Sequence, residues 1–396
     1  MYIAFIVTSY WALGELLIAQ YFARQISACG FKPYFIIPPT HEKVLKESGF
    51  QYTILFPKMP KINRVLLQDF QHKYRPVLVI LSDFINFHFC EKHYGLTCDD
   101  LKIFRGRIGT FDNFHWKLEK REMDTYGFKA KDVNDVDIDR YGFRLLPSPI
   151  VNPGADCLGE EAYCYPLVDD YLDYDDKAKK KLRQKLSLPQ DQPIGLVTSA
   201  AWQNTHKQYP HVEKFVRYSS DTFTKILKGA FEKGVILWVG KKPDFNPGNE
   251  VKIIHFDGLT PKEFETYAMA ADVYISKNIS STTLARFSLS GLPTAVLINS
   301  GSAVAGLEES VNYPFRMFPV GWYKFLNPVL KDNPYTRLVK EMEIFDVPQT
   351  VEGLKNLALN EEARENCKSE ASRFRERLER LMKPGEIVET ILGSRR

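Results

Sequence analysis

Two successive series of apolar segments alternate with helical patterns, and this alternation constrains the fold more than any other feature of the chain. In the first series, apolar runs of strand length occupy residues 2–7, 33–37, 51–56 and 77–83. A second series places strands at 193–200, 235–240, 250–258, 272–278 and 292–300, with helical patterns between them. Such alternation is typical of parallel sheets covered by helices on both faces. Because 396 residues exceed what one core usually serves, we expect two α/β domains.

The segments between and after these series set the expected domain boundaries. Residues 103–153 are aromatic and mixed in charge, then rich in proline and glycine, which predicts loops leading to the passage between domains. A charged helix is expected over 175–188 with its lysines on a solvated face, and 360–392 is helical by pattern. The prediction is an N-terminal domain over 1–165, a second domain over 166–370 and a C-terminal helix over 371–396.

Composition indicates a soluble cytoplasmic protein. The 53 basic and 49 acidic side chains leave a net charge of +4, which does not by itself indicate a nucleic-acid partner. The apolar N-terminus lacks a basic leader and is interrupted by polar residues, so we expect neither a targeting nor a transmembrane segment. Six scattered cysteines without zinc-ligand spacing predict free thiols and no metal. The GxGxxG, P-loop, HExxH and GxSxG patterns are absent, which disfavours the enzyme classes that use them.

Two carboxylates are expected at the carboxyl ends of the first series of strands. Glu15 follows Gly14 at the turn into the first helix, and Asp83 ends the strand over 77–83. Ligands of open α/β sheets bind at this edge, so both carboxylates are candidates for acid-base chemistry. The alternative interpretation is that each residue caps or begins a helix.

A run of small hydroxyl residues, Ser281 to Thr283, begins a helical pattern in the second series. Free backbone amides and the positive end of the helix dipole would suit a diphosphate there. Simple helix capping is the alternative.

The segment from Phe256 to Ser300 resembles the donor-binding region of GT-B glycosyltransferases. Its matching elements are Ala270-Ala271-Asp272, the turn Ser280–Thr283, and Ser290-Gly291-Leu292-Pro293. The resemblance is nearest to the UDP-glycosyltransferases and the peptidoglycan N-acetylglucosamine transferase. The N-terminal turn and helix, Gly14–Ile18 and Phe22–Ile26, resemble the acceptor domain of the same superfamily. The resemblance implies two Rossmann-like doubly wound domains facing each other across a cleft, with a C-terminal helix that can cross back to the N-terminal domain.

The resemblance also implies roles for individual residues. In many relatives a histidine in the turn is the base, and an acidic residue that ends a later strand orients it. In the matching positions of this chain, Glu15 replaces the histidine and Asp83 is the later acidic residue. Either carboxylate is therefore a candidate base. Arg286 falls where the family commonly has a ribose-binding glutamate, and it would pair with a phosphate or a carboxylate instead. By analogy, Ser199 would lie near the phosphates and His255 near the nucleobase.

The implied reaction is a metal-independent, inverting sugar transfer from a nucleotide-diphosphate sugar to a small-molecule acceptor. No cofactor is expected to stay bound; UDP is the first choice of nucleotide, with dTDP and GDP as alternatives. Trp202 and His206 are further candidates for lining the site, and Lys241 and Lys242 are expected to be exposed. The aromatic and basic residues of 104–121 would serve either as an acceptor surface or as core plus a solvated face: Phe104, Phe111, Phe114, His115, Trp116, Arg105, Arg107 and Arg121.

The sequence leaves other functions open. A non-hydrolysing sugar-nucleotide epimerase would share the architecture, but the sequence offers no convincing set of acid-base groups around one sugar ring. A nucleic-acid glycosyltransferase and a catalytically silent GT-B subunit are the remaining alternatives. The donor sugar, the acceptor and the oligomeric state are not indicated.

Overall fold

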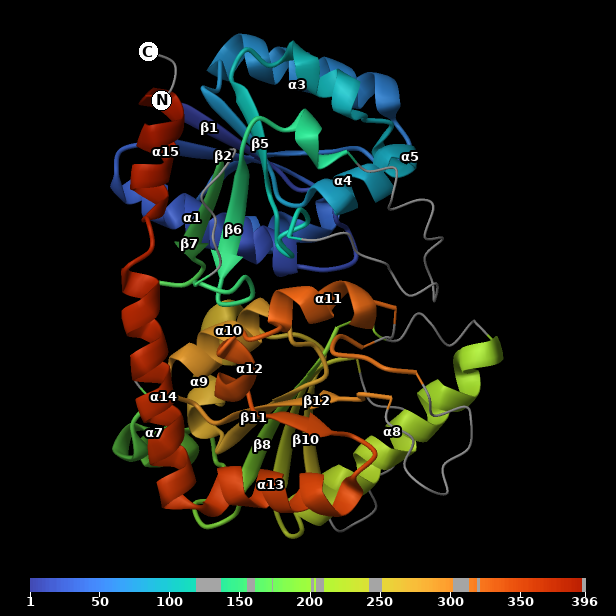
Figure 1. Ribbon diagram of the computed structural model, residues 1–396, viewed down its shortest axis with the longest axis vertical. Coiled ribbons are helices and arrows are strands. Elements are labelled where there is room, and N and C mark those ends of the chain that lie inside the picture. Colours follow the sequence, from blue (N-terminus) through green and yellow to red (C-terminus); the bar gives the residue numbers. More distant parts are fainter. Residues whose placement is uncertain are drawn as a thin grey trace. The chain divides into compact units, whose positions relative to one another are not determined.

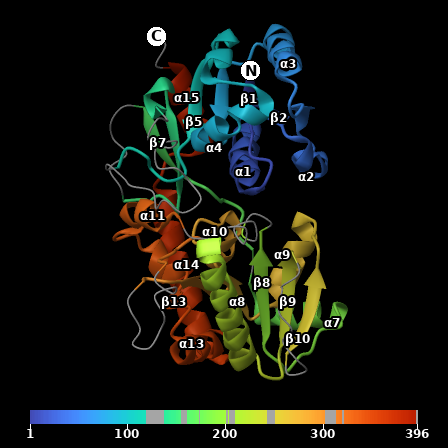
Figure 2. The same ribbon diagram turned by 90° about the vertical axis from the view of Figure 1, so that its right-hand side faces the viewer.

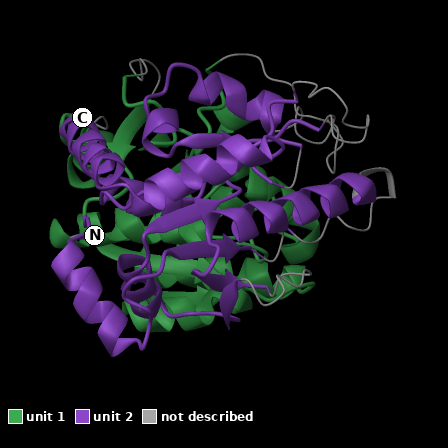
Figure 3. Cartoon of the chain, turned by 90° about the horizontal axis from the view of Figure 1, so that it is seen from below, with its two compact units in different colours: residues 1–120, 129–169, 377–396 green, residues 121–128, 170–376 purple. Residues whose placement is uncertain are grey.

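The structure is a computed structural model that describes residues 1–118, 137–154, 161–172, 174–200, 203, 210–241, 251–301, 313–318 and 321–393. The chain divides into two compact units, drawn in different colours in Figure 3. Among the described residues, unit 1 runs from Met1 to Asp169 and resumes at Arg377, and unit 2 runs from Asp170 to Glu376. Each unit has its own parallel sheet with helices around it, which confirms the expected α/β fold class.

The sheet of unit 1 reverses its direction of winding between its first and fourth strands. Its order is β3 (Gln51–Ile54), β2 (Lys32–Ile37), β1 (Tyr2–Ile6), β4 (Leu78–Leu81), β5 (Arg107–Phe111), β6 (Arg144–Ser148) and β7 (Ala162–Pro166). All of these pairings are parallel. The chain winds outward from β1 to β3 and then returns to β4 on the other side of β1. The carboxyl ends of β1 and β4 therefore flank the topological switch point, where α/β sheets bind ligands.

The expectation of loops throughout residues 103–153 is wrong, because β5 and β6 lie within this segment. Gly109 in β5 lies directly under the Phe143 ring, so it leaves space for a large neighbour instead of contributing an apolar side chain. Arg144 in β6 is buried and pairs with Asp112. Glycine and buried charge hide the apolar pattern by which strands are recognised.

Helices α1 (Gly14–Ala28) and α15 (Pro384–Gly393) lie side by side in unit 1 (Figure 1). The Phe22 ring of α1 packs on the sheet, with ring centroids 5.6 Å from Phe111 and 5.1 Å from Tyr165. Arg107 Nη1 in β5 donates to the Ile391 carbonyl of α15 at 2.9 Å. The end of the chain thus returns to the N-terminal unit, as the resemblance implied.

The other α-helices that the structure describes in unit 1 are α2 (Glu42–Ser48), α3 (Pro60–Tyr74), α4 (Phe84–Phe89) and α5 (Glu91–Tyr94). The C-terminal helical pattern forms two helices, α14 (Glu361–Glu379) and α15, which are separated shortly before Pro384. Proline is tolerated in the first turn of a helix but interrupts the middle of one, so Pro384 begins a new helix instead of continuing α14.

The sheet of unit 2 has the order β10 (Lys252–Phe256), β9 (Val235–Gly240), β8 (Ile194–Ser199), β11 (Val273–Ser276), β12 (Thr294–Ile298) and β13 (Glu341–Glu343). Its pairings are parallel, and its switch point lies between β8 and β11. Each unit therefore has a single switch point among its described strands.

Two helices, α8 (Pro210–Ala230) and α13 (Val347–Leu359), lie side by side against the sheet of unit 2 (Figures 1 and 2). Their apolar residues share one buried cluster with strands β8, β9, β11 and β12. Helices α9 (Pro261–Ala270) and α10 (Thr282–Leu289) pack together through Phe264 and Phe287, with ring centroids 5.4 Å apart. The connection from β8 to β9 moves across the sheet in one direction, and the connection from β11 to β12 moves in the other. Because both crossovers are expected to be right-handed, α8 and α10 cover opposite faces of the sheet. The remaining helices in the described part of this unit include α7 (Asp176–Lys185), α11 (Tyr323–Leu330) and α12 (Tyr335–Leu338).

Candidate active site

Glu15 and Asp83 lie at the carboxyl ends of β1 and β4, on the two sides of the switch point of unit 1. Glu15 is the second residue of α1, and Asp83 is the residue before α4. The structure therefore brings the two carboxylates predicted from the sequence into one cluster. Their catalytic roles stay predictions.

Asp83 is buried, and both of its carboxylate oxygens accept hydrogen bonds. The backbone N–H of Asn86 donates to Oδ1 at 2.7 Å, which makes Asp83 the N-cap of α4, and Asn113 Nδ2 donates to Oδ2 at 3.0 Å. Burial, followed by the nearby charge of Glu15, raises the pKa of Asp83 to about 7. The capping interpretation thus describes the local structure, but it does not account for this pKa.

Glu15 has one bonded and one unbonded carboxylate oxygen. Asn86 Nδ2 donates to its Oε1 at 2.7 Å, whereas Oε2 is buried and has no hydrogen-bond partner among the described residues. Burial raises the pKa of Glu15 to about 6, against the opposing effects of its own backbone amide and the Ser9 and Asn86 side chains. Asn86 thus links the two carboxylates, with its backbone amide on one and its side-chain amide on the other.

Among the described residues, neither Arg144 nor His41 supplies free positive charge to this pair. Arg144 Nη1 lies 3.3 Å from Asp112 Oδ2, and both oxygens of Asp112 also accept from the backbone N–H of Trp116. His41, which ends the short helical turn Pro39–His41 after β2, is buried, and burial lowers its pKa to about 4, so it is neutral at pH 7.

Sequence reasoning missed Asn86, Asn113 and the pairing of Asp112 with Arg144. Asn86 lies three residues after Asp83, the spacing at which a capping contact is expected, so this spacing is a signal that could have found it. Asn113 follows a strand that the sequence did not reveal, and no local signal marks it.

Two predicted nucleotide-binding residues of unit 2 lie at the carboxyl edge of its sheet. Ser199 ends β8 and pairs in register with Gly240, which ends β9. Gly240 has φ +106°, and a Cβ there would collide with the Ser199 carbonyl, so the two backbones approach closely. His255 Nε2 in β10 donates to the Gly240 carbonyl at 2.7 Å. The structure therefore connects Ser199 and His255 through Gly240.

Ser281 is the N-cap of α10, and its Oγ accepts from the Leu284 backbone N–H at 3.3 Å. Thr282 and Thr283 are the first two residues of the helix. Within the described part of the chain, their backbone N–H groups have no hydrogen-bond partner. Capping is therefore confirmed for Ser281, while the amides of both threonines keep the geometry that suits an anion.

Arg286 is buried within α10 and pairs with carboxylates of its own unit. Its Nη2 lies 3.1 Å from Asp170 Oδ2, and its Nη1 forms an ion pair with Glu265. A role toward a nucleotide stays a prediction for this residue.

The remaining candidates divide into three groups. Trp202, His206, Lys242 and Arg121 lie outside the described residues. Lys241 is exposed, as expected. Phe104, Phe111 and His115 are buried, so these three side chains belong to the interior rather than to an open stacking surface.

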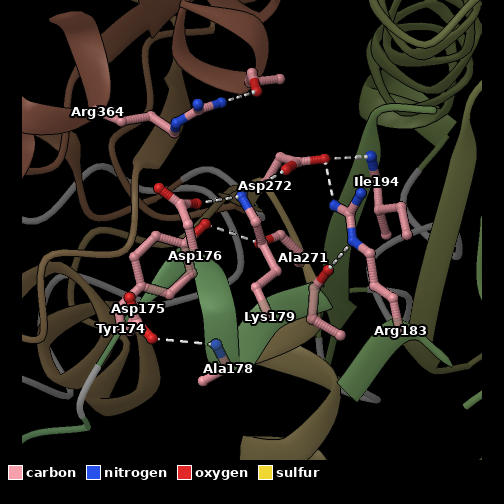
Figure 4. Close-up of polar contacts among 12 residues, drawn as sticks. Tyr174, Asp175, Asp176, Ala178, Lys179, Arg183, Ile194, Ala271, Asp272 and Arg364 are labelled. Carbon is pink, nitrogen blue, oxygen red and sulfur yellow. Dashed lines mark hydrogen bonds and ion pairs between the residues drawn. The ribbon is translucent and has the colours of Figure 1, made fainter. Parts of the chain in front are cut away.

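Asp272, from the segment whose sequence resembles a donor-binding region, organises the opposite end of the unit 2 strands (Figure 4). Its carboxylate accepts from Arg183 Nη2 at 2.6 Å, Lys179 Nζ at 3.1 Å and the Ile194 backbone N–H at 2.8 Å. The expectation that the lysines of 175–188 form a solvated face is wrong for Lys179, because this cation of α7 is buried against Asp272.

Comparisons with known proteins place this geometry in a wider context. A family model described as a family of unknown function, DUF6365, matches residues 22–395. The chain belongs to the DUF6365 family. Comparison of the sequence with curated proteins gave no match.

Several solved glycosyltransferases share the fold of this DUF6365 chain. UGT89C1 of Arabidopsis thaliana, complexed with quercetin, is 10% identical with a TM-score of 0.60, covering 99% of this chain and 98% of its own. The spinosyn forosaminyltransferase SpnP (12% identity, TM-score 0.55) and the glycosyltransferase VinC in complex with dTDP (9%, 0.55) also cover 99% of this chain and 98% of theirs. The DUF6365 chain therefore has the GT-B fold.

Two further kinds of feature are absent from the part of the chain that the structure describes. No group of three or more His, Cys, Asp or Glu side chains there is arranged to hold a metal ion. No helix in the described ranges combines the length and apolarity needed to cross a bilayer.

Proposed function

We propose that this DUF6365 protein is a cytoplasmic glycosyltransferase. It transfers a sugar from a nucleotide-diphosphate donor to a hydroxyl group of a small-molecule acceptor, with inversion and without a metal ion. The GT-B fold supports this proposal but does not by itself decide it, since one fold serves several activities.

The observation that carries the proposal is the acidic pair at the switch point of unit 1. Buried Glu15 and Asp83, with pKa values raised to about 6 and 7, lie near neutrality, where a general base works best. Such perturbed carboxylates at a ligand-binding edge of a sheet are typical of acid-base sites. Either carboxylate would take the proton of the acceptor hydroxyl.

The donor is expected on unit 2. The free amides of Thr282 and Thr283, at the positive end of α10, would stabilise the departing diphosphate. Ser199, at the adjacent end of β8, would donate to the same phosphates, and the backbone around His255 would meet the nucleobase. The complex of VinC with dTDP supports a nucleotide diphosphate. UDP is our first choice, with dTDP and GDP next.

Titration calorimetry with UDP, dTDP and GDP tests the donor site, and incubation with the corresponding nucleotide sugars tests turnover. We expect one nucleotide to bind and its sugar to be hydrolysed slowly or transferred to a hydroxylated acceptor. Glu15→Gln should retain binding and lose turnover. Binding without turnover by the wild type, across sugars and acceptors, would contradict the transferase and favour a silent binding subunit.

A further inference from the structure

The acidic site of unit 1 is a continuous hydrogen-bonded chain rather than two independent carboxylates. Asn113 donates to Asp83, the backbone amide of Asn86 donates to the other oxygen of Asp83, and the side-chain amide of Asn86 donates to Glu15. Within this chain, two buried side-chain oxygens lack a hydrogen-bond partner among the described residues: Glu15 Oε2 at one end and Asn113 Oδ1 at the other.

The two carboxylates are not equivalent within this chain. Asp83 is only 3% exposed, and each of its oxygens already accepts a hydrogen bond, one of them from the first turn of α4. Glu15 uses only Oε1, and its Oε2 is buried without a partner among the described residues. A buried polar atom without a partner is costly, and at the ligand-binding edge of the sheet a substrate hydroxyl could complete it.

We infer that Glu15 is the base and that Asn86 is the positioning residue that fixes its Oε1 and leaves Oε2 for the acceptor hydroxyl. This inference rests on the proposed glycosyl transfer. Asp83 then anchors Asn86 through the helix cap and does not itself contact the substrate.

The chemical step balances without a further reactant. The acceptor O–H proton moves to Glu15 Oε2 while the acceptor oxygen forms a bond to the anomeric carbon of the donor sugar. The bond from that carbon to the diphosphate oxygen breaks, and the nucleotide diphosphate leaves with the electron pair. Asn86 donates to Oε1 throughout, so it favours the ionised carboxylate that the step requires.

Substitution of Asn86 can separate its two contacts. Asn86→Ala removes the side-chain donor to Glu15 but keeps the backbone N–H that donates to Asp83. Loss of a hydrogen bond to a charged group should raise the pKa of Glu15 by about one to two units. Asn113→Ala is the matched control, because it removes a donor from Asp83 and leaves the bond between Asn86 and Glu15 intact.

The first measurement is a carbon-13 NMR titration of the glutamate carboxyl groups in the free protein, with the Glu15 signal assigned by Glu15→Gln. We expect the Glu15 titration to move to higher pH in Asn86→Ala and to stay or move lower in Asn113→Ala. Asn86→Asp, which has a similar shape but lacks the amide donor, should raise the Glu15 pKa as well, and it keeps the test decisive if the alanine variant fails to fold. An unchanged Glu15 titration in a folded Asn86 variant overturns the positioning role.

The second measurement is the pH dependence of kcat/KM with the nucleotide sugar and acceptor found by the binding and turnover screen. The acid limb should follow Glu15 and shift upward in Asn86→Ala, and Glu15→Gln should lose about 100-fold or more in kcat/KM. A larger loss in Asp83→Asn than in Glu15→Gln overturns the assignment of the base. If no sugar nucleotide is turned over, the proposed function and the base role fail together, while the NMR titration still decides whether Asn86 positions Glu15.

Discussion

Asp272→Asn offers the sharpest test of how unit 2 is held together. The residue Asp272 is 5% exposed, and its carboxylate neutralises two buried cations, Arg183 at 2.6 Å and Lys179 at 3.1 Å. It also accepts from the Ile194 backbone N–H at 2.8 Å, which connects α7 to the first strand of the unit. The asparagine has the same shape but only one acceptor oxygen and no charge.

The expected cost follows from burial. Removing one partner of a buried ion pair leaves an uncompensated charge and typically costs about 3–5 kcal/mol. Asp176→Asn is the matched control, since Asp176 contacts the same ammonium of Lys179 at 2.8 Å but has a side chain that is 43% exposed. Exposed pairs contribute about 0–1 kcal/mol, so the control should lose no more than that.

Urea denaturation followed by pulsed hydrogen exchange of peptides from β8 and β9 reports on unit 2 alone. We expect Asp272→Asn to move the midpoint of that transition strongly and Asp176→Asn to leave it nearly unchanged. Equal losses in the two variants would refute the reasoning, because burial would then not decide the contribution of these contacts.

Three further predictions concern single residues. The pKa of Asp83 is raised from 3.8 to about 7 in the folded chain. Between these pH values the folded chain retains a proton that the unfolded chain releases. The free energy of unfolding should therefore fall as the pH rises from about 4 to about 7. Asp83→Asn, which can still cap α4, should flatten that fall in urea titrations, and an unchanged slope would contradict the assignment. Gly240→Ala should lower the free energy of unfolding by about 1–3 kcal/mol in thermal unfolding, because φ at this residue is +106°. Gly258→Ala is the control, since Gly258 has open space around it, and it should cost clearly less. Equal costs in the two variants would argue against backbone strain at Gly240. Arg286→Lys keeps the charge but loses the forked guanidinium, so we expect a loss of about 1.5–3 kcal/mol in urea unfolding with little change in nucleotide affinity. A tenfold weaker nucleotide complex of normal stability would instead favour the role toward a nucleotide that its position in the sequence suggested.

The strands that can be recognised in the sequence are those buried on both faces by apolar side chains. β1 and β4 read as continuous apolar runs, so their carboxyl ends, and with them Glu15 and Asp83, could be located from the sequence alone. β5 and β6 could not, because β5 contains Gly109 and β6 begins with the buried Arg144, and the suitability of these residues depends on Phe143 and Asp112 from neighbouring segments. A local pattern cannot show a partner that only the folded chain supplies.

The same distinction applies to the polar groups of both units. Ser281 lies three residues from the amide that it caps, so its local role follows from the sequence. The partners of Arg286 come from Asp170 and Glu265, which are 116 and 21 positions away, and no local pattern relates them. For Lys179 the prediction from the sequence is wrong. A lysine in a charged helix is expected to be exposed, but this one contacts Asp272, which is 93 positions away in the sequence.

The resemblance implies that Glu15 stands where many relatives have a turn histidine, and this difference need not remove the base from the proposed reaction. An unperturbed glutamate is a weak base, because its pKa near 4.3 lies far below that of histidine, near 6.5. Burial raises the pKa of Glu15 to about 6, which restores most of that difference, and the ionised form still predominates at pH 7. Complete burial without donors would raise the pKa further and leave the group protonated, so the Glu15 backbone amide and the side chains of Ser9 and Asn86 have to oppose desolvation. A carboxylate can therefore serve at this turn only together with neighbouring hydrogen-bond donors, and among these donors Asn86 is the one that also contacts Asp83.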